Sequence, residues 1–235
     1  MVDILKDNLK NNKKEFLKRL GSYEGWAVPH AWPLNHTRPN GGYPDNSVFF
    51  SEAFALYSLV KKFKIDVFIE SGVYRGGSTS VWGRVLPEVK VFSVDYLKEG
   101  REPRKKWEGV KSVMEPLYPN INFIEGNGNI ILPQLIEENP DKRIGVFVDG
   151  PKDEEGLKLA KKCLSYDNVF FSSLHDYTSP QYFHTRLDEF REFTQDLDIN
   201  HPQILKYPKG AGLTILLEGF ETGTISTEGL LKHQQ

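Results

Sequence analysis

Hydrophobic positions follow two alternating patterns along the chain from residue 47 onward. Short apolar runs, typical of strands buried on both faces, occur at residues 66–69, 89–94, 121–124, 144–148 and 169–171. Apolar residues at helical spacing lie before and between these runs, at residues 47–63, 79–86, 104–114, 130–138 and 154–164. Strands that alternate with helices predict βαβ units and a parallel sheet covered on both faces.

The C-terminal part of the chain predicts a different ending. Residues 181–197 have helical character, and the apolar runs at 203–207 and 213–218 flank a Pro-Lys-Gly-Ala-Gly segment. Two such runs around a glycine-containing turn predict a β-hairpin. The expected fold is therefore α/β, a Rossmann-like doubly wound sheet of seven strands, mostly parallel, with a C-terminal antiparallel β-hairpin.

The first part of the chain does not fit the alternating pattern. Residues 3–20 predict a helix, and residues 22–46 are rich in Pro, Gly and Asn but contain Trp26 and Trp32. A loop of this length in a compact domain is typical of a lid, and its aromatic residues fit either a lid over a substrate or packing against the domain. We therefore expect an N-terminal helix and lid segment at 1–46, a main domain at 47–220 and a polar tail at 221–235.

Composition excludes several classes of protein. The 235 residues include 30 Lys and Arg against 32 Asp and Glu, for a net charge of −2, so no basic excess calls for a nucleic-acid partner. Cys163 is the single cysteine, which excludes an intramolecular disulfide and a cysteine-based zinc site. No apolar run approaches the roughly 18–20 residues of a membrane span, and the polar, Lys-rich N-terminus does not resemble a secretion signal. We expect a cytoplasmic protein with no membrane partner, and the oligomeric state stays open, a homodimer included.

The loop after the first expected strand carries the strongest functional signal. Ligands of doubly wound sheets bind beyond the carboxyl ends of the strands, where the strand order reverses. The sequence here is Glu-Ser-Gly-Val-Tyr-Arg-Gly-Gly-Ser, and its glycines permit close approach of a ligand to the backbone. The spacing is not the G-x-G-x-x-G of dinucleotide sites. We expect cofactor contacts from this segment, with Glu70 suited to a cationic ligand group; the candidates are Glu70, Gly72, Tyr74, Gly76, Gly77 and Ser78.

Polar residues also end the second and third expected strands. Asp95 follows Glu70 by 25 residues, where a carboxylate can hold a ribose diol through two charge-assisted hydrogen bonds. Asn127 lies in a Gly-Asn-Gly segment, which fits either a contact to an adenine edge or an ordinary turn.

The fourth and fifth expected strands end in residues with acid–base and metal chemistry. Asp149 and Asp176 fall at the carboxyl ends of adjacent strands, and two converging carboxylates suit Mg²⁺. His175 can add a nitrogen ligand or act as a general base. Lys152 can accept a proton if burial or a nearby cation lowers its pKa.

These residues together resemble a known family. The E-x-G-x-Y-x-G-x-S segment, the acid after the second strand and the Asp after the fourth resemble class I S-adenosylmethionine-dependent methyltransferases. The segment is similar to that of catechol O-methyltransferase and related metal-dependent enzymes, over about residues 47–219. The resemblance implies that residues 72–77 and Ser78 hold the methionine end of S-adenosylmethionine, with Asp95 on the ribose and Asp149 also at the cofactor.

The resemblance also implies a metal site. Asp149-Gly-Pro-Lys152 matches the spacing of a metal-binding Asp and a catalytic Lys in that family. The fifth strand departs from the pattern, because Tyr177 stands where the family has Asn. An alternative alignment, with sugar O-methyltransferases related to macrocin methyltransferase, uses His175 and Asp176 as the pair. The expected metal ligands are Asp149, His175 and Asp176; the expected catalytic residues are Asp149 and, as base, Lys152 or His175.

The expected function is methyl transfer from S-adenosylmethionine to a hydroxyl of a small molecule, such as a sugar, a natural product or a phenol. Mg²⁺ or another divalent cation would assist it. One alternative is a different enzyme on the same scaffold, hydroxylase-like or aminopropyl-transferring. The other is a binding module that keeps the cofactor site without catalysis.

Overall fold

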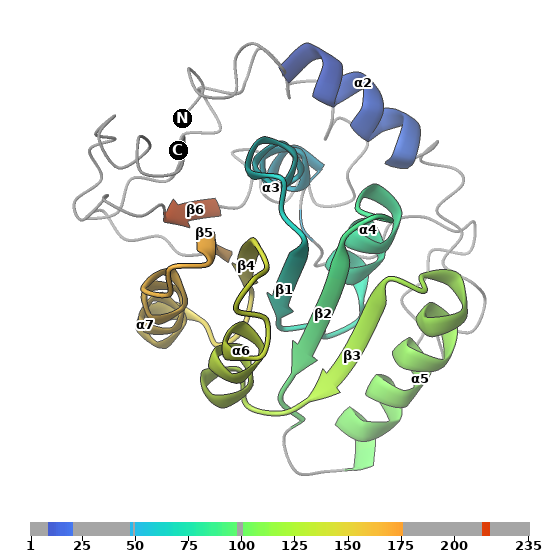
Figure 1. Ribbon diagram of the computed structural model, residues 1–235. Helices are drawn as coiled ribbons and strands as arrows, with labels where there is room; N and C mark the ends of the chain where they lie inside the picture. The colour runs from blue at the N-terminus through green and yellow to red at the C-terminus, as the bar shows by residue number, and fades with distance from the viewer. Residues whose placement is uncertain (1–8, 21–47, 49, 98–100, 176–212, 217–235) are drawn as a thin grey trace.

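The computed structural model describes residues 9–20, 48, 50–97, 101–175 and 213–216, and these form an α/β fold around one sheet (Figure 1). The strands are β1 (Val67–Ser71), β2 (Lys90–Asp95), β3 (Ile121–Glu125), β4 (Ile144–Val148), β5 (Val169–His175) and β6 (Leu213–Leu216). The helices are α2 (Leu9–Leu20), α3 (Phe50–Phe63), α4 (Gly77–Val85), α5 (Arg101–Leu117), α6 (Gly128–Glu137) and α7 (Asp153–Leu164). No helix in these ranges is both long enough and apolar enough to cross a bilayer.

The sheet has the order β3-β2-β1-β4-β5-β6, with the first five of these strands parallel and β6 antiparallel to β5. The chain moves outward from β1 through β2 to β3 and then returns to β4 on the other side of β1. This reversal between β1 and β4 is the switch point of a doubly wound sheet. The Rossmann-like α/β expectation is therefore confirmed. The expected strand at 203–207 and helix at 181–197 lie outside the described residues, so a seventh strand and the hairpin stay predictions.

Helices cover both faces of the sheet because the parallel strands are apolar on both sides (Figure 1). Phe68 of β1 joins Phe147 and Phe171 in a core beneath α2, α3 and α4. Val67 and Ile69, the neighbours of Phe68 on the same strand, belong to a second core beneath α6 and α7. The period of two along each strand thus sends alternate side chains into opposite cores.

Helix α2 belongs to the first of these cores and is not a separate appendage. Phe16 is fully buried, and its ring centroid lies 5.5 Å from those of both Phe54 and Tyr57 on α3. The expected 1–46 segment is thus divided: its helix packs on the main domain, and residues 21–46 lie outside the described residues.

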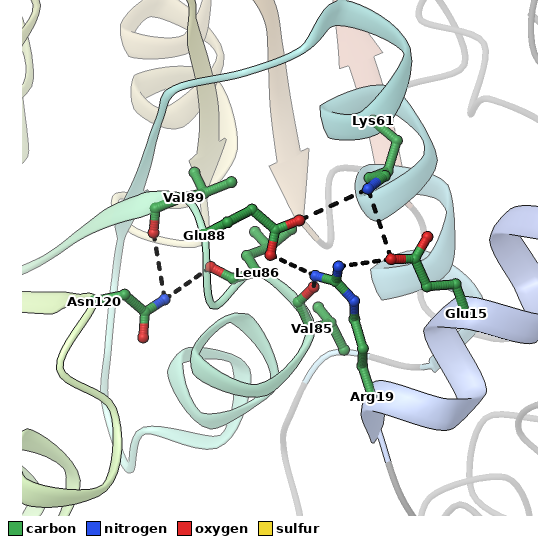
Figure 2. A network of polar contacts seen from close by, with 8 residues as sticks. All are labelled: Glu15, Arg19, Lys61, Val85, Leu86, Glu88, Val89 and Asn120. Atoms are coloured by element: carbon green, nitrogen blue, oxygen red, sulfur yellow. Dashed lines mark hydrogen bonds and ion pairs between the residues drawn. The ribbon is translucent and has the colours of Figure 1, made fainter.

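A polar network fixes the C-terminal end of α2 (Figure 2). The Arg19 guanidinium donates to the Val85 carbonyl at 2.8 Å and pairs with Glu88 and Glu15 at 2.6 Å each. Lys61 of α3 lies 3.7 Å from both carboxylates. These groups are partly exposed, so the ion pairs contribute little by themselves and mainly set the register of the helix on the core.

Replacing Phe16 with Ala should lower the free energy of unfolding by about 3–5 kcal/mol, because the change leaves a cavity between α2 and α3. Leu17→Ala is the matched control: Leu17 is 41% exposed on the same helix and its loss should cost no more than about 0.5 kcal/mol. Urea denaturation of both variants measures the difference. Equal, small effects would show that α2 does not stabilise the domain.

Candidate functional site

The site lies at the carboxyl edge of the sheet, where the register of the strands sets its residues in one row. Ser71 pairs with Val94 and Val148, Val94 pairs with Ile124, and Val148 pairs with Leu174. The next residue of each strand is therefore at the same edge; these residues are Gly72, Asp95, Glu125, Asp149 and His175. Asp95, Asp149 and His175 were all predicted from the sequence as site residues, and the structure brings them to this one edge.

The ends of β1 and β4 are held together by backbone contacts. The Ser71 carbonyl accepts from the amides of Asp149 at 2.7 Å and Gly150 at 2.9 Å, and the Ser71 hydroxyl donates to the Gly150 carbonyl. Gly72 follows with φ +98°, and a Cβ on it would lie 2.8 Å from the Gly150 nitrogen. Only glycine fits there. From the sequence we expected these glycines to let a ligand approach the backbone, whereas Gly72 in the structure lets the end of β4 approach the end of β1.

The loop after β1 is fixed by Asp95. The Oδ2 atom of Asp95 accepts from the amides of Tyr74 at 2.7 Å and Val73 at 3.2 Å. The loop then turns at Gly76, φ +74°, into α4, and Gly77 and Ser78 are buried in the first turn of that helix. Burial raises the pKa of Asp95, although these amides oppose the shift and the negative charge of Asp149 adds to it. The second strand therefore ends in a carboxylate that orders the loop after β1 and lies at the carboxyl edge of the sheet.

The side chain of Glu70 faces the protein interior and is not exposed at the carboxyl edge of the sheet. Its side chain is fully buried, and its two oxygens accept from the Thr79 hydroxyl at 2.6 Å, the Trp82 indole at 2.9 Å and the Ser93 hydroxyl at 2.9 Å. The expectation that Glu70 meets a cationic ligand group does not match this placement. Its carboxylate instead ties β1 to α4 and β2 beneath the loop.

Burial raises the pKa of Glu70 to about 7, although hydrogen bonds from Ser78, Thr79, Ser93 and Trp82 oppose the shift. The fully buried carboxyl loses more solvation on ionising than these four donors return.

Asn127 caps a helix. Its side chain accepts from the Asn129 amide at 2.9 Å, which makes it the N-cap of α6. A Cβ on the following Gly128 would lie 2.6 Å from the Ser71 hydroxyl oxygen, so the start of α6 approaches the end of β1. Asn127 is thus a helix N-cap in place of the ordinary turn residue that was one alternative, and the adenine contact stays a prediction.

Apolar side chains are exposed around this edge. Tyr74 in the loop is 52% exposed, Tyr96 directly after Asp95 is 62% exposed, and Ile130 in the first turn of α6 is 57% exposed. Large apolar surfaces beside a carboxylate are suited to a ligand with a flat ring and a polar, hydroxylated part. Tyr96 and Ile130 carried no sequence motif, and only the structure places them beside the site residues.

Four charged side chains form a chain on the β4–β5 side of the edge. The Lys152 ammonium and Nδ1 of His175 both contact Oδ1 of Asp149, the latter at 2.8 Å. Nε2 of His175 lies 3.2 Å from Oε2 of Glu52. We name this set the Glu52–Lys152 network: Glu52, His175, Asp149 and Lys152, in the order in which they are in contact.

Within the Glu52–Lys152 network, opposite charges favour the charged forms of their neighbours. Burial opposes the charged form of His175, but the negative charges of Glu52 and Asp149 hold its pKa well above the usual value. Burial likewise opposes ionisation of Asp149, but His175 and then Lys152 hold the pKa of that carboxyl below its usual range. These contacts therefore favour a charged His175 ring beside an ionised Asp149.

Glu52 was missed in the sequence. It lies in the first turn of α3, fully buried, and 123 positions before His175. Its contact with His175 places the first turn of α3 at the carboxyl edge of the sheet. A carboxylate in the first turn of a helix is favoured by the helix dipole. A glutamate inside an apolar helical pattern was the available signal.

The structure brings two of the three expected metal ligands, Asp149 and His175, into contact. Both ring nitrogens of His175 face carboxylate oxygens, and Oδ1 of Asp149 already accepts from two positive groups. No group of three or more His, Cys, Asp or Glu suited to a metal ion occurs among the residues the structure describes. The expectation of a metal held by Asp149, His175 and Asp176 stays a prediction. Asp176, the third expected ligand, lies outside the described residues.

No protein-family model and no curated protein matches the chain. Among solved structures, it is similar to the O-methyltransferase TomG from Streptomyces achromogenes, solved with S-adenosylmethionine (17% identity, 72% of this chain and 78% of that one, TM-score 0.44). It is also similar to CalS11, a TDP-rhamnose 3'-O-methyltransferase (12% identity, 90% of this chain and 94% of that one, TM-score 0.42). A third similar structure is the N-terminal domain of EvdMO1 in the presence of S-adenosylhomocysteine and D-fucose (16% identity, 77% of this chain and 66% of that one, TM-score 0.41). Two of these three solved structures are O-methyltransferases by name.

Replacing Glu70 with Gln should remove a pH dependence of stability. Between pH 4.5 and about 7 the unfolded chain has released the Glu70 proton and the folded chain keeps it, so stability falls as pH rises through this window. The shift corresponds to about 3 kcal/mol. Gln can present its oxygen to Trp82 and its amide to the two hydroxyls, which can accept.

Urea denaturation of both proteins at pH 5 and pH 8 measures this. The wild type should lose about 2.5 kcal/mol more than Glu70→Gln between the two conditions, since the unfolded carboxyl is already mostly ionised at pH 5. Equal losses would show that Glu70 ionises normally in the folded chain.

Proposed function

We propose that this protein is an S-adenosylmethionine-dependent O-methyltransferase that acts on a hydroxyl group of a small molecule. The observation that carries the proposal is the position of Asp95, at the end of β2, with Oδ2 against the loop amides that follow β1. This is the switch-point edge of the sheet, where a ribose and its neighbouring groups bind in doubly wound folds. The absent G-x-G-x-x-G spacing argues against a dinucleotide in the same place.

The described residues fit S-adenosylmethionine along this edge. The carboxylate of Asp95 would accept from the ribose hydroxyls, and the exposed rings of Tyr96 and Tyr74 would cover apolar parts of the cofactor. The turn at residues 72–77 offers backbone approach for the methionine end. When bound, the cofactor supplies a methyl group on a positively charged sulfur, which is already a good electrophile.

The chain's own residues must then position an acceptor oxygen and receive its proton. Lys152 and Asp149 end the half of the site opposite Asp95, and Lys152 is 46% exposed, so an acceptor can reach it. His175 is not available as base in this arrangement, because both of its nitrogens face carboxylates. Of the two expected bases we therefore assign Lys152, whose ammonium must first release a proton, and with it the ion pair to Asp149, before it can accept one from the acceptor. Placing the acceptor oxygen in line with the transferred methyl can contribute up to about 7–11 kcal/mol in favourable cases.

The acceptor class follows from the same contacts. A charged, hydrogen-bonding edge beside exposed aromatic rings suits a polar hydroxylated molecule with a flat or ring-shaped body, such as a sugar or a phenolic natural product. A divalent metal at Asp149, His175 and Asp176 stays a prediction, because Asp176 lies outside the described residues.

S-adenosylhomocysteine should bind and stabilise the full chain. At about 100 times its dissociation constant it should add about 2.7 kcal/mol, or about 5–11 °C in the unfolding midpoint. Asp95→Asn keeps an oxygen for the Val73 and Tyr74 amides but loses the charge, so affinity should fall about 10–100-fold, as for the loss of a charge-assisted hydrogen bond. Calorimetric titration measures both affinities.

Asp66→Asn is the matched control, because Asp66 also accepts from a backbone amide, that of Arg143, but lies at the opposite edge of the sheet. It should bind S-adenosylhomocysteine like the wild type. Absence of binding by the wild type, or equal losses in the two variants, would contradict the proposed cofactor site.

A further inference from the structure

Arg75 carries a positive charge without a counter-ion in the loop after β1. Its guanidinium lies over the ring of Tyr74, 5.0 Å from the ring centroid. Its Nε atom is buried and has no hydrogen-bond partner, and its side chain forms no ion pair within the part of the chain that the structure describes. A guanidinium has five N–H donors in a fixed fork, so Arg75 keeps a planar set of donors for a ligand.

The backbone beneath this cation is fixed in an uncommon conformation. Tyr74 has φ +49°, in the left-handed region that residues other than glycine rarely adopt. Oδ2 of Asp95 holds it there by accepting from the amides of Val73 and Tyr74. Such conformations cost free energy and are concentrated at ligand sites. The loop therefore presents Arg75 at a defined place, directly before α4.

The groups around Arg75 favour a negatively charged ligand. Helix α4 begins two residues later at Gly77, and no side chain caps its N-terminus. The amides of a first helical turn carry a partial positive charge that favours anions. The two nearby carboxylates are engaged elsewhere: Glu70 with hydroxyl and indole donors in the interior, and Asp95 with the loop amides. A free guanidinium in this setting is suited to a carboxylate or a phosphate.

The proposed cofactor offers one of these two groups. S-adenosylmethionine has no phosphate, and its methionine end, which we assign to the turn at residues 72–77, carries a carboxylate. We infer that Arg75 binds this carboxylate and makes the site select the carboxylated cofactor. The inference rests on the proposed function and deepens it. Decarboxylated S-adenosylmethionine, which donates aminopropyl groups, lacks the carboxylate, so Arg75 favours methyl transfer over the aminopropyl-transferring alternative.

Calorimetric titration of the full chain with two ligands tests this inference. S-adenosylhomocysteine has the carboxylate, whereas S-adenosyl-3-thiopropylamine keeps the adenosine, the sulfur and the amine and lacks only the carboxylate. The wild type should bind the first about 10–100-fold more tightly, as for one charge-assisted contact. Arg75→Gln removes the charge and should lose most of this preference. It should weaken S-adenosylhomocysteine about 10–100-fold and S-adenosyl-3-thiopropylamine by about threefold or less.

Arg143→Gln is the matched control. The Arg143 guanidinium also lies over an aromatic ring, that of Phe170 at 4.4 Å, and its Nε atom has no hydrogen-bond partner among the described residues. Arg143 directly precedes β4 and therefore lies at the opposite edge of the sheet. This variant should bind both ligands like the wild type.

A merely structural role for Arg75 would weaken both ligands equally, so equal losses in Arg75→Gln would overturn the inference. Equal affinity of the wild type for the two ligands would overturn it as well. A wild type that binds S-adenosylhomocysteine while Arg75→Gln binds it equally well would uphold the proposed function and refute the role of Arg75. A wild type that binds neither ligand would refute both.

Discussion

The close approach of β1 and β4 at their carboxyl ends is the constraint on which the rest of the structure depends. The Ser71 carbonyl receives two amides from residues 149 and 150, and Gly72 leaves no room for a side chain between the two strand ends. This contact fixes the switch point of the sheet. It also sets how far the loop after β1 lies from Asp149, and therefore how the two halves of the candidate site face each other.

Two different electrostatic arrangements meet at that contact. On the β2 side, carboxylates stabilise the loop: Glu70 from beneath, with a pKa raised by burial, and Asp95 from the edge, through the amides of Val73 and Tyr74. On the β5 side, Glu52, His175, Asp149 and Lys152 alternate in charge, so each buried group has an opposite neighbour. The first arrangement orders the loop of the proposed cofactor site, and the second fixes the side chains of the proposed acceptor site. Buried charges are tolerated in both because each has hydrogen-bonding partners.

The sequence was sufficient to predict the sheet because its signal is local. Each buried parallel strand is a short apolar run, and Asp95, Asp149 and His175 directly follow such runs, so their shared edge follows from the parallel register. Element ends were less predictable: β5 extends to His175, beyond the apolar run, because pairing with β6 continues there.

Long-range contacts could not be predicted in this way. Glu52 meets His175 across 123 positions, and nothing in a helical pattern says which buried glutamate will face which strand end. The strand-end position of Glu70 suggested a ligand contact, whereas the polar groups of α4 and β2 surround it. The N-terminal helix was separated from the domain by an irregular segment, yet Phe16 packs between α3 side chains. In each case the local sequence pattern allowed two roles for a residue, and tertiary packing decided between them.

Hydrogen–deuterium exchange of the full chain with and without S-adenosylhomocysteine tests the central claim most directly, because it reports binding and place together. The account predicts slower amide exchange at residues 72–78 and 95–97, at the carboxyl edge, with little change at the opposite edge near Asp66. Unchanged exchange in both segments at saturating ligand, or protection confined to other parts of the chain, would contradict it.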